Sequence, residues 1–482
     1  MRSQQHPEQR AAEIATSIEG PDPAANAQAP AVGSPGPEAA APARPDLDRD
    51  ARPRLHSPDR QQLLSSRTID ELLEADHPAR AVWSYVEGLD LAPLYDRIRA
   101  RGSVAGRPAI DPRLLVALWL YATLSGVSSA RELADLCLRH DAFRWLAGGV
   151  SVNYHTLADF RTDHLEFTEQ LLTQSVEVLR QQDRIDLDRI APDGMRVRAS
   201  AGAASFRRRE TLERLLQEAQ AEVQRLQQKL AATAADPPAP QQVVTERASA
   251  SEPPSPRQAA AALHHAEDRL ERIEQALERM PELEAKIKPD DDKEARVSTT
   301  DPKATVMKMA DGGYRPAYNI EYATACRGQV IVGVDVVTQG SDQGQLPPML
   351  DQIENRFGVR PKEVLVDGGV VNLKDIAHVQ GEKECTVYAP VAKPKKEGVD
   401  RHVPKATDSE EVAEWRKRMG TPEAKEIYKE RAATSECVNA QARNRGLQQL
   451  TVRGIEKVKS IASWFAIVHN MARSFALQPQ PG

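Results

Sequence analysis

The sequence predicts an α+β protein with an α/β-like core, an all-helical amino-terminal domain and a helical-hairpin insertion. Apolar residues in the segment 63–179 recur at the three- and four-residue spacing of amphipathic helices. β-branched and apolar runs of strand length follow at residues 187–201, 318–323, 329–337 and 362–367. Between the first and second of these runs, residues 205–295 carry two further helical patterns. We therefore expect a sheet whose strands are separated in sequence by a helical insertion.

The composition limits the classes of protein to which the chain can belong. The formal net charge is −6, so DNA contact has to come from local basic surfaces rather than from the whole protein. No apolar run reaches the roughly 18 residues of a membrane-spanning helix, and residues 1–20 lack the apolar segment of a signal peptide. The cysteines form no C-x-x-C pair, which fits a reducing compartment and argues against a structural zinc site. These observations predict a cytoplasmic protein with no membrane partner.

The amino-terminal part divides into a tail and a helical domain. Residues 1–58 are rich in alanine and proline and poor in large apolar groups, so we expect a disordered tail there and a short tail at residues 477–482. Residues 59–184 are predicted to be helical, and Asp111 followed by Pro112 marks a helix start. The candidate helices span residues 68–73, 80–88, 91–101, 112–124, 130–139, 142–146, 154–164 and 166–181.

A helix-turn-helix unit is one interpretation of residues 129–164. The helices of this segment are joined by a connection that contains Gly148-Gly149. In a helix-turn-helix unit the end of the chain around Asn153 and His155 would enter a DNA groove. The alternative is a helical bundle that packs against the sheet domain.

The first predicted strand, at residues 187–201, carries Asp193. Pro192 has no N–H to donate and is unfavourable inside a central strand. We therefore expect the strand to be irregular just before Asp193 or to begin there. Arg196 and Arg198 lie two residues apart and share a face of the strand, where they line a phosphate path or face water.

Residues 205–295 predict an antiparallel pair of packed helices. Apolar residues three and four apart form a seam in each helix, at Leu212, Leu216, Ala219, Val223, Leu226 and Leu230 and at Leu263, Ala266, Leu270, Ile273, Leu277 and Met280. A loop rich in proline, serine and alanine lies between them and can reverse the chain, although the seam could also join two copies of the protein. We expect an arm that assembles a dimer or grips DNA, with Arg207, Arg208 and Arg209 at its base.

The core resumes at residue 296. The polar segment 296–319 offers Lys308, Arg315 and Tyr318 as candidates for contact with a DNA backbone. A β-hairpin follows, then a helix, and then a buried strand that ends at Asp367. The later elements are a helix at residues 372–379, a strand at 385–389 and helices at 410–420, 427–445 and 455–475.

The helix predicted around Glu436 has a chemical face. At about 100° per residue, with Tyr428 at zero, Arg431 lies at about −60°, Glu436 at about 80° and Arg443 at about 60°. One side therefore presents a phenol, a carboxylate and two guanidiniums, and Arg445 adds a cation at the end of the helix. The alternative is a solvated helix with charge pairs three and four residues apart.

The candidate catalytic and metal-binding residues are two strand-borne aspartates and one helix-borne glutamate, Asp193, Asp367 and Glu436. Mg²⁺ prefers hard oxygen ligands, commonly a few carboxylates together with substrate phosphates and water. Two such ions stabilise the attacking and leaving oxygens of an in-line displacement at phosphorus. Mn²⁺ suits the same oxygen-lined site.

At these residues the chain resembles bacterial insertion-sequence DDE transposases. The two aspartate motifs of that family are matched by Asp193-Gly194-Met195 and Asp367-Gly368-Gly369. Its spaced Tyr, Arg, Glu and Lys/Arg signature is matched by Tyr428, Arg431, Glu436 and Arg443. The similarity extends to residues 106–126, 151–161 and 296–319 and covers roughly residues 63–473.

The resemblance implies an RNase H-like mixed sheet at residues 185–204 and 296–476, in which the three carboxylates hold two Mg²⁺ ions. It implies binding of terminal inverted repeats and target DNA, phosphodiester hydrolysis and strand transfer. A homodimer would form in the synaptic complex, and the DNA-bound protein would lie in the bacterial nucleoid. The residues implied to contact DNA are Tyr428, Arg431, Arg443, Arg445, Lys308, Arg315, Asn153 and His155.

Other functions are compatible with the same residues. A structure-selective nuclease would use the three carboxylates without joining ends. A decayed transposase would bind DNA without cutting it, and two departures from the family pattern leave room for this: Met195 in place of threonine and Val370 in place of an aromatic residue. A helical interaction protein built around residues 205–295 would not depend on the carboxylates at all.

Overall fold

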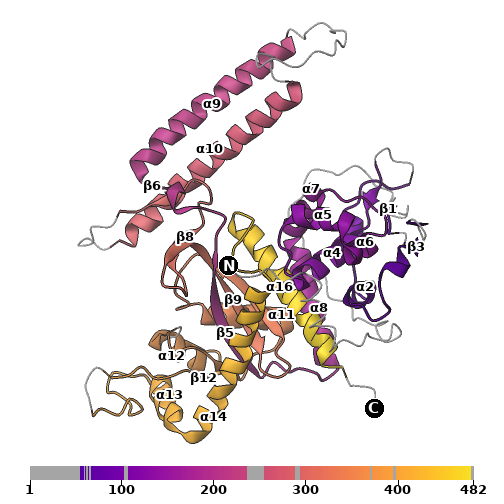
Figure 1. Ribbon diagram of the computed structural model, residues 1–482. Helices are drawn as coiled ribbons and strands as arrows, with labels where there is room; N and C mark the ends of the chain where they lie inside the picture. The colour runs from indigo at the N-terminus through magenta and orange to yellow at the C-terminus, as the bar shows by residue number, and fades with distance from the viewer. Residues whose placement is uncertain are drawn as a thin grey trace.

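The computed structural model describes residues 55–58, 60, 63–64, 67–102, 107–235, 255–287, 294–369, 372–394 and 398–478. Residues 1–54 of the predicted amino-terminal tail, residues 479–482 and the predicted hairpin loop at 236–254 lie outside this part. A helical amino-terminal region packs beside a central sheet, and a long helical arm projects from the sheet (Figure 1). No helix of the described part is long and apolar enough to span a membrane.

The amino-terminal region is built around a buried helix, α4 (Pro112–Leu124). This helix begins where predicted, because the Asp111 carboxylate accepts the N–H of Arg113 at 2.9 Å and Pro112 takes the first helical position. The surrounding helices are α2 (Pro78–Glu87), α3 (Ala92–Asp96), α5 (Ala130–Arg139), α6 (Asp141–Ala147), α7 (Tyr154–Thr162) and α8 (Leu165–Gln181). Short strands pair as β1 (Leu55–His56) with β4 (Ala109–Ile110) and β2 (Leu63–Leu64) with β3 (Arg67–Thr68).

Two predicted helices are much shorter than expected. The segment 68–73 contains only a 3₁₀ turn, η2 (Asp70–Leu72), and α3 ends at Asp96 rather than at residue 101. The buried Arg101 side chain donates to the carbonyl oxygens of Tyr95 and Ile98 at 2.7 and 3.0 Å. In a longer helix, backbone N–H groups would bind these carbonyl oxygens. Here the Arg101 side chain takes their place.

The central sheet is mixed. Its strands are β5 (Arg189–Arg198), β8 (Thr305–Lys308), β9 (Tyr314–Ala325), β10 (Ile331–Val337), β11 (Glu363–Leu365) and β12 (Thr386–Tyr388). The order is β10-β9-β5-β11-β12, and β8 also pairs with β9. Neighbours are antiparallel from β10 to β5, whereas β11 runs parallel to β5 and β12 runs parallel to β11. The predicted RNase H-like sheet, with a hairpin of antiparallel strands and two parallel strands beside the first strand, is confirmed.

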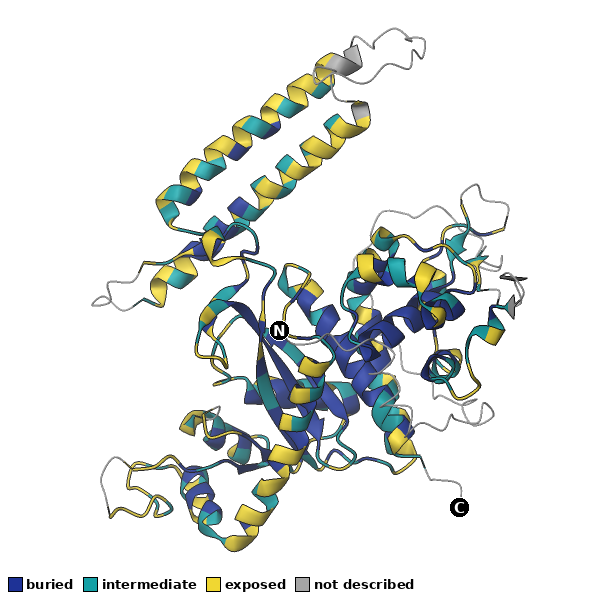
Figure 2. Ribbon diagram, in the orientation of Figure 1, coloured by how far each residue is buried: buried dark blue, intermediate teal, exposed yellow. Residues whose placement is uncertain are grey.

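Helices cover both faces of the sheet. On one face α16 (Ile455–Ala476) packs against β10 and also against α4, α7 and α8. The other face is covered by α11 (Leu346–Phe357), α12 (Leu373–Gly381) and α13 (Glu410–Gly420). Buried residues are concentrated in the sheet and in the helices between it and the amino-terminal region (Figure 2). The amino-terminal helices therefore share a hydrophobic core with the sheet.

The arm is the predicted helical hairpin. Its helices α9 (Arg209–Ala235) and α10 (Pro256–Ala285) pack against each other (Figure 1). At the base, Arg209 forms an ion pair with Glu284 at 2.6 Å, which joins the start of one helix to the end of the other. The buried seam residues are Leu212, Ala219, Val223, Ile273 and Met280. The strands β6 (Phe206–Arg207) and β7 (Val297–Ser298) pair where the arm meets the body.

Candidate active site

Asp193 lies on the central strand β5, opposite Tyr322 of β9. Its largely buried carboxylate accepts hydrogen bonds from Arg431 Nη2 at 3.2 Å and from Asn439 Nδ2 at 2.8 Å. Burial raises the pKa of the Asp193 carboxyl group, and the nearby carboxylates of Asp342 and Asp367 raise it further, whereas Arg431 lowers it. The position of this carboxylate is thus set by two donors from another part of the chain.

Pro192 does not interrupt β5, so the prediction of an irregular or late-starting strand is wrong. The pairing of β5 with β9 continues through Pro192, which lies opposite Ala323. The parallel pairing with β11, in contrast, stops at Ile190. A residue without an N–H is tolerated here because, after Ile190, β5 has no hydrogen-bonded partner on the β11 side until its last residue, Arg198, which pairs with Gln449. The sheet therefore opens between β5 and β11 immediately before Asp193.

Asp367 lies at this opening. It follows β11 by two residues and is exposed. The register places Val364 beside Ile190, so continuing it by three residues brings Asp367 level with Asp193. The glycine after it is needed for a close approach, since a Cβ on Gly368 would lie 3.1 Å from the carbonyl oxygen of Pro390. The two aspartates thus reach the same edge of the sheet from neighbouring strands.

The helix predicted at residues 427–445 is not a single regular α-helix. A π-helical turn interrupts it. The hydroxyl groups of Thr434 and Ser435 donate to the main-chain carbonyls of the residues four positions earlier, at 2.9 and 3.1 Å. These bonds satisfy carbonyl groups at the place where the α-helical ladder is disturbed. The run consists of α14 (Pro422–Arg431), the π turn η4 (Ala432–Glu436) and α15 (Cys437–Asn444).

The π turn brings Glu436 to the side of the helix that carries Arg431. On a regular α-helix, residues five apart are separated by about 140°, since each residue turns the chain by about 100°. In a π turn, five residues complete roughly one turn. Arg431 Nη1 accordingly donates to Glu436 Oε1 at 3.4 Å. Because Arg431 Nη2 also holds Asp193, one guanidinium bridges the strand carboxylate and the helix carboxylate.

Tyr428 lies one turn before Arg431 and is half-buried. Burial raises the pKa of its phenol, and Asp367, Asp193 and Glu436 raise it further, while Arg431 lowers it. All three predicted carboxylates are therefore within electrostatic reach of the Tyr428 hydroxyl. The structure brings these five residues together from two neighbouring strands and one helical run.

The donor atoms of this site fit a hard divalent cation. Asp193, Asp367 and Glu436 offer only carboxylate oxygens, the ligands that Mg²⁺ prefers. Within the described residues no three His, Cys, Asp or Glu side chains are already close enough to hold an ion together. Arg431 stands between Asp193 and Glu436 and balances their charge. The Glu436 side chain is 62% exposed, so its carboxylate can turn without disturbing the core.

Two carboxylates beside the site are not marked by any local sequence pattern. Glu321 of β9 lies opposite Gly194, and a Cβ on Gly194 would lie 2.8 Å from Glu321 Oε1 and 2.5 Å from Asp342 Oδ1. The amide of Asn319 donates to both carboxyl groups. Burial, reinforced by Asp342, raises the pKa of Glu321 to about 9, so Glu321 is protonated at neutral pH. Only the pairing of β9 with β5 reveals this cluster.

Wild type is expected to lose stability as the pH rises, and replacing Glu321 with glutamine should make this loss smaller. A carboxyl group whose folded pKa is raised favours the folded state at low pH, and this contribution is lost as the pH rises from the ordinary value of 4.5 to about 9. Glutamine keeps a donor for Asp342 and an acceptor for Asn319 but does not titrate. Urea denaturation at about pH 5 and about pH 9 should show a smaller decrease in unfolding free energy in Glu321→Gln, by about 1 kcal/mol or more. Equal decreases in both proteins would contradict a protonated Glu321.

Two family models match parts of the chain. Residues 67–163 match a model described as a transposase domain (DUF772), and residues 378–475 match a model described as a transposase DDE domain. The second match contains the helical run that presents Tyr428, Arg431 and Glu436. The two matches support an insertion-sequence DDE transposase. Comparisons of this transposase with curated proteins and with solved structures gave no match.

The predicted DNA-binding arginines at the end of the helical run that carries Glu436 differ in their surroundings. Arg443 is exposed on α15. Arg445 follows α15, and burial lowers its pKa to about 10, an effect that nearby Cys437 partly offsets. Arg445 also lies close enough to His469 of α16 to lower the pKa of that histidine. Arg445 therefore lies between α15 and α16 rather than beside the three carboxylates, and its contact with DNA stays a prediction.

Lys308 and Arg315 lie on the hairpin that β8 and β9 form beside β5. Lys308 is exposed, and its carbonyl oxygen accepts a hydrogen bond from Arg196 Nη1 at 2.7 Å. Arg315 forms an exposed ion pair within its own turn. Tyr318 is fully buried and donates its hydroxyl to Asp301 Oδ1 at 2.7 Å, so the prediction that Tyr318 contacts a DNA backbone is wrong. One edge of this hairpin is therefore basic, because it carries Lys308 and Arg315 and is contacted by Arg196 of β5.

Asn153 and His155 lie at the start of α7. The Asn153 side chain accepts the N–H of Thr156 at 2.9 Å and therefore caps the helix. The exposed His155 ring lies 4.0 Å from the ring of Tyr154, and the guanidinium of Arg131 lies 4.9 Å from the centre of that tyrosine ring. The structure gives Asn153 a structural role, and contact of either residue with DNA stays a prediction.

Proposed function

We propose that this transposase cuts and joins DNA by metal-assisted phosphoryl transfer at Asp193, Asp367 and Glu436. The observation that supports this most is the bridge from Asp193 through Arg431 to Glu436, with Asp367 level with it at the opening between β5 and β11. A divalent metal at these carboxylates would activate water or a 3′ hydroxyl and stabilise the leaving oxygen. The proposed ions are two Mg²⁺, with Mn²⁺ as a substitute, because both prefer oxygen ligands.

The residues around the carboxylates have separate proposed roles. Asp193 supplies a ligand from a rigid strand, whereas Glu436 supplies one that can turn because its side chain is 62% exposed. Arg431 holds the two carboxylates together and, when they bind cations, turns to offset the charge of the scissile phosphate. The raised pKa of Tyr428 disfavours its phenolate, so Tyr428 positions DNA or the helix and does not attack phosphorus.

The wider assignments are part of the same proposal. The DNA would be the terminal inverted repeats of the element and the target, and two copies of the protein would meet in the synaptic complex. Residues 59–184 would bind DNA, residues 185–204 and 296–476 would carry out the chemistry, and the protein would act at the nucleoid in the bacterial cytoplasm. Concerted work on two element ends is the reason for expecting a homodimer.

Cleavage of DNA that carries the flanks of the protein's own gene tests the proposal. With Mg²⁺, and not with EDTA, wild type should nick a defined terminus. Asp193→Asn, Asp367→Asn and Glu436→Gln should each cut at least about a hundredfold more slowly, because metal stabilisation of the transition state is worth several kcal/mol. Glu430→Gln is the matched control: Glu430 lies on the same helical run, but its carboxylate pairs with Arg189 at 2.8 Å.

Each alternative function predicts a different result in this assay. A nuclease would cut but never join the cut end to a second DNA. A decayed transposase would bind DNA without cutting it; Met195, one of the departures from the family pattern, is 1% exposed and packs in the hydrophobic core. Cutting that survives in all three carboxylate variants would overturn the proposed site.

A further inference from the structure

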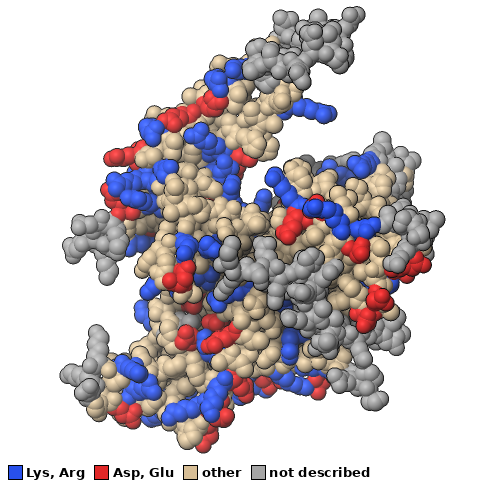
Figure 3. All heavy atoms as spheres, in the orientation of Figure 1, with Lys and Arg blue, Asp and Glu red and all other residues tan. Residues whose placement is uncertain are grey.

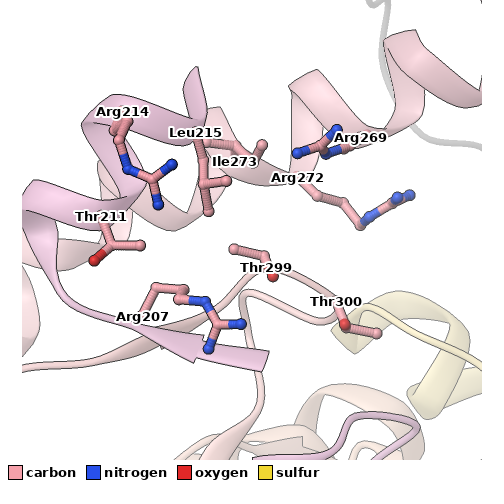
Figure 4. Close-up of a pocket in the computed structure, with 9 residues that line it drawn as sticks. All are labelled: Arg207, Thr211, Arg214, Leu215, Arg269, Arg272, Ile273, Thr299 and Thr300. Carbon is pink, nitrogen blue, oxygen red and sulfur yellow. The ribbon is translucent and has the colours of Figure 1, made fainter. Parts of the chain in front are cut away.

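The base of the arm contains a basic pocket of about 410 Å³. Four arginines from both sides of the arm line it, together with two threonines that follow β7: Arg207, Arg214, Arg269, Arg272, Thr299 and Thr300. Figure 4 shows these side chains around one opening, with Arg207 on β6 below and the helix-borne arginines above. None of the described residues that line the pocket is an aspartate or a glutamate. Basic side chains also gather where the arm joins the body in Figure 3.

The charge of this pocket is only partly balanced by the protein. Arg214 pairs with Glu218 at 2.5 Å, but both side chains are about half exposed or more, so the pair is weak and can open. In the described part of the chain, no carboxylate forms an ion pair with Arg207, Arg269 or Arg272. The Nε of Arg272 is buried and has no hydrogen-bond partner there. A buried donor without a partner is costly, and an anionic ligand would supply the missing acceptor.

Guanidinium and hydroxyl groups in this combination match the oxygens of a phosphate. Arginine presents a planar set of N–H donors that binds phosphate in a bidentate manner, and threonine hydroxyls commonly add phosphate contacts in DNA-binding proteins. Four arginines around one opening suit a polyanion better than a single small anion. The open shape of the pocket also suits a strand that passes along it, which a phosphodiester backbone does.

The position of the pocket links it to the carboxylate site. Strand β5 continues past Asp193 to its end at Arg198, and a short connection that contains a 3₁₀ turn then leads to β6 and Arg207. Arg196 and Arg198 lie on this strand between the two sites. The arm is fixed to the body at the start of β8. There the buried Arg279 of α10 donates to the carbonyl oxygens of Pro302 and Ala304 and to Thr305 Oγ1. The pocket is therefore held in a constant position relative to β5.

We propose that this pocket binds the phosphate backbone of a DNA segment that extends from the active site, and that the arm thereby holds the DNA independently of its sequence. This inference rests on the proposed function in that the substrate is DNA, but it concerns binding and not chemistry. Contacts to phosphates raise affinity without reading bases. The pocket should thus strengthen the binding of element ends and of unrelated DNA alike.

Binding of the full chain to labelled duplexes in EDTA tests this inference without any cleavage. The double variant Arg214→Gln/Arg269→Gln removes two exposed pocket cations and keeps most of each side chain. We expect at least tenfold weaker binding at about 100 mM salt, for a terminus duplex and for an unrelated duplex, and a slope of log affinity against log salt that is smaller by about one to two. The matched control is Arg257→Gln, which removes an exposed arginine near the start of α10 that does not line the pocket.

The outcomes separate this inference from the proposed function. If wild type binds DNA but does not cut it, the carboxylate proposal fails. The pocket proposal is then still tested by the slope of log affinity against log salt. Equal affinities and slopes for wild type and the double variant would overturn the pocket proposal. It would also be overturned if inorganic pyrophosphate bound the pocket in an Arg214- and Arg269-dependent manner while DNA affinity did not depend on these arginines. A melting temperature within a few degrees of wild type for the double variant confirms that the comparison is made on folded protein.

Discussion

Deletion of Ala440 is expected to abolish DNA cleavage by the transposase, whereas deletion of Ala432 is expected to preserve it. Both alanines are exposed and lie in the same helical run, Ala432 in the π turn and Ala440 in the regular helix α15. A π turn contains about one residue more than an α turn. Removing Ala432 should therefore leave a regular α-helix whose two ends keep their faces. Arg431 and the glutamate now at position 436 would then lie four residues apart, which is a normal spacing for side chains that meet on an α-helix.

Deletion of Ala440 has the opposite effect. It rotates one part of a regular helix by about 100° relative to the other, so that buried Ala442 and Leu447 can no longer pack while Asn439 holds Asp193. Cleavage of terminus DNA and thermal melting measure both effects. We expect cleavage within about tenfold of wild type for the Ala432 deletion, and a loss of at least a hundredfold with a lower melting temperature for the Ala440 deletion. Equal loss in both proteins would show that the π turn is not what aligns Glu436 with Arg431.

Replacement of Arg431 by methionine is expected to destabilise the protein strongly at neutral pH and only weakly in acid. The Arg431 and Asp193 side chains are 10% and 16% exposed, so the substitution leaves a carboxylate in a low-dielectric site without its cation. Removing one partner of a buried ion pair costs about 3–5 kcal/mol. The variant should raise the pKa of Asp193 further above its ordinary value. Below the ordinary pKa of an aspartate, the Asp193 carboxyl group is protonated in both the folded and the unfolded protein. The loss of stability therefore appears as the pH rises from acid toward neutrality.

Urea denaturation at about pH 7.5 and about pH 4.5 measures this difference. Arg443→Met is the matched control, because Arg443 is exposed on the same helical run and its replacement should change the unfolding free energy by no more than about 0.5 kcal/mol. Adding Asp193→Asn to Arg431→Met should recover much of the lost stability, since no uncompensated charge then remains. Two arginine variants with the same stability at both pH values would contradict the bridge between Asp193 and Glu436.

The elements that carry the site could be predicted from local patterns in the sequence. The alternating residues around Asp193 and the apolar run before Asp367 both indicate strands, and parallel neighbours bring their ends to one edge of a sheet. The seam of the arm and the start of α4 were equally visible, because apolar spacing and helix caps are local signals. The boundaries between domains stay a prediction, as does the DNA contact of the individual basic residues.

The details of the site depend on interactions that the sequence does not display locally. A helical wheel assumes the same rotation for every residue and therefore placed Arg431 and Glu436 about 140° apart. The only local signal of the π turn is the pair Thr434-Ser435, whose hydroxyls can compete for main-chain carbonyls. Glu321 was missed for a different reason. Its place beside Gly194 depends on the register of two strands that the arm separates in sequence.

Binding of Mn²⁺ to the complex with terminus DNA tests the central claim most directly, because it detects the ion at the three carboxylates rather than the reaction. The loss of the free Mn²⁺ signal in electron paramagnetic resonance gives the number of ions bound and their affinity. The account predicts that wild type and Glu430→Gln bind Mn²⁺ alike, and that Asp193→Asn and Asp367→Asn lose at least one ion each while still binding DNA. The same Mn²⁺ binding in all four proteins, or none in wild type, would contradict it.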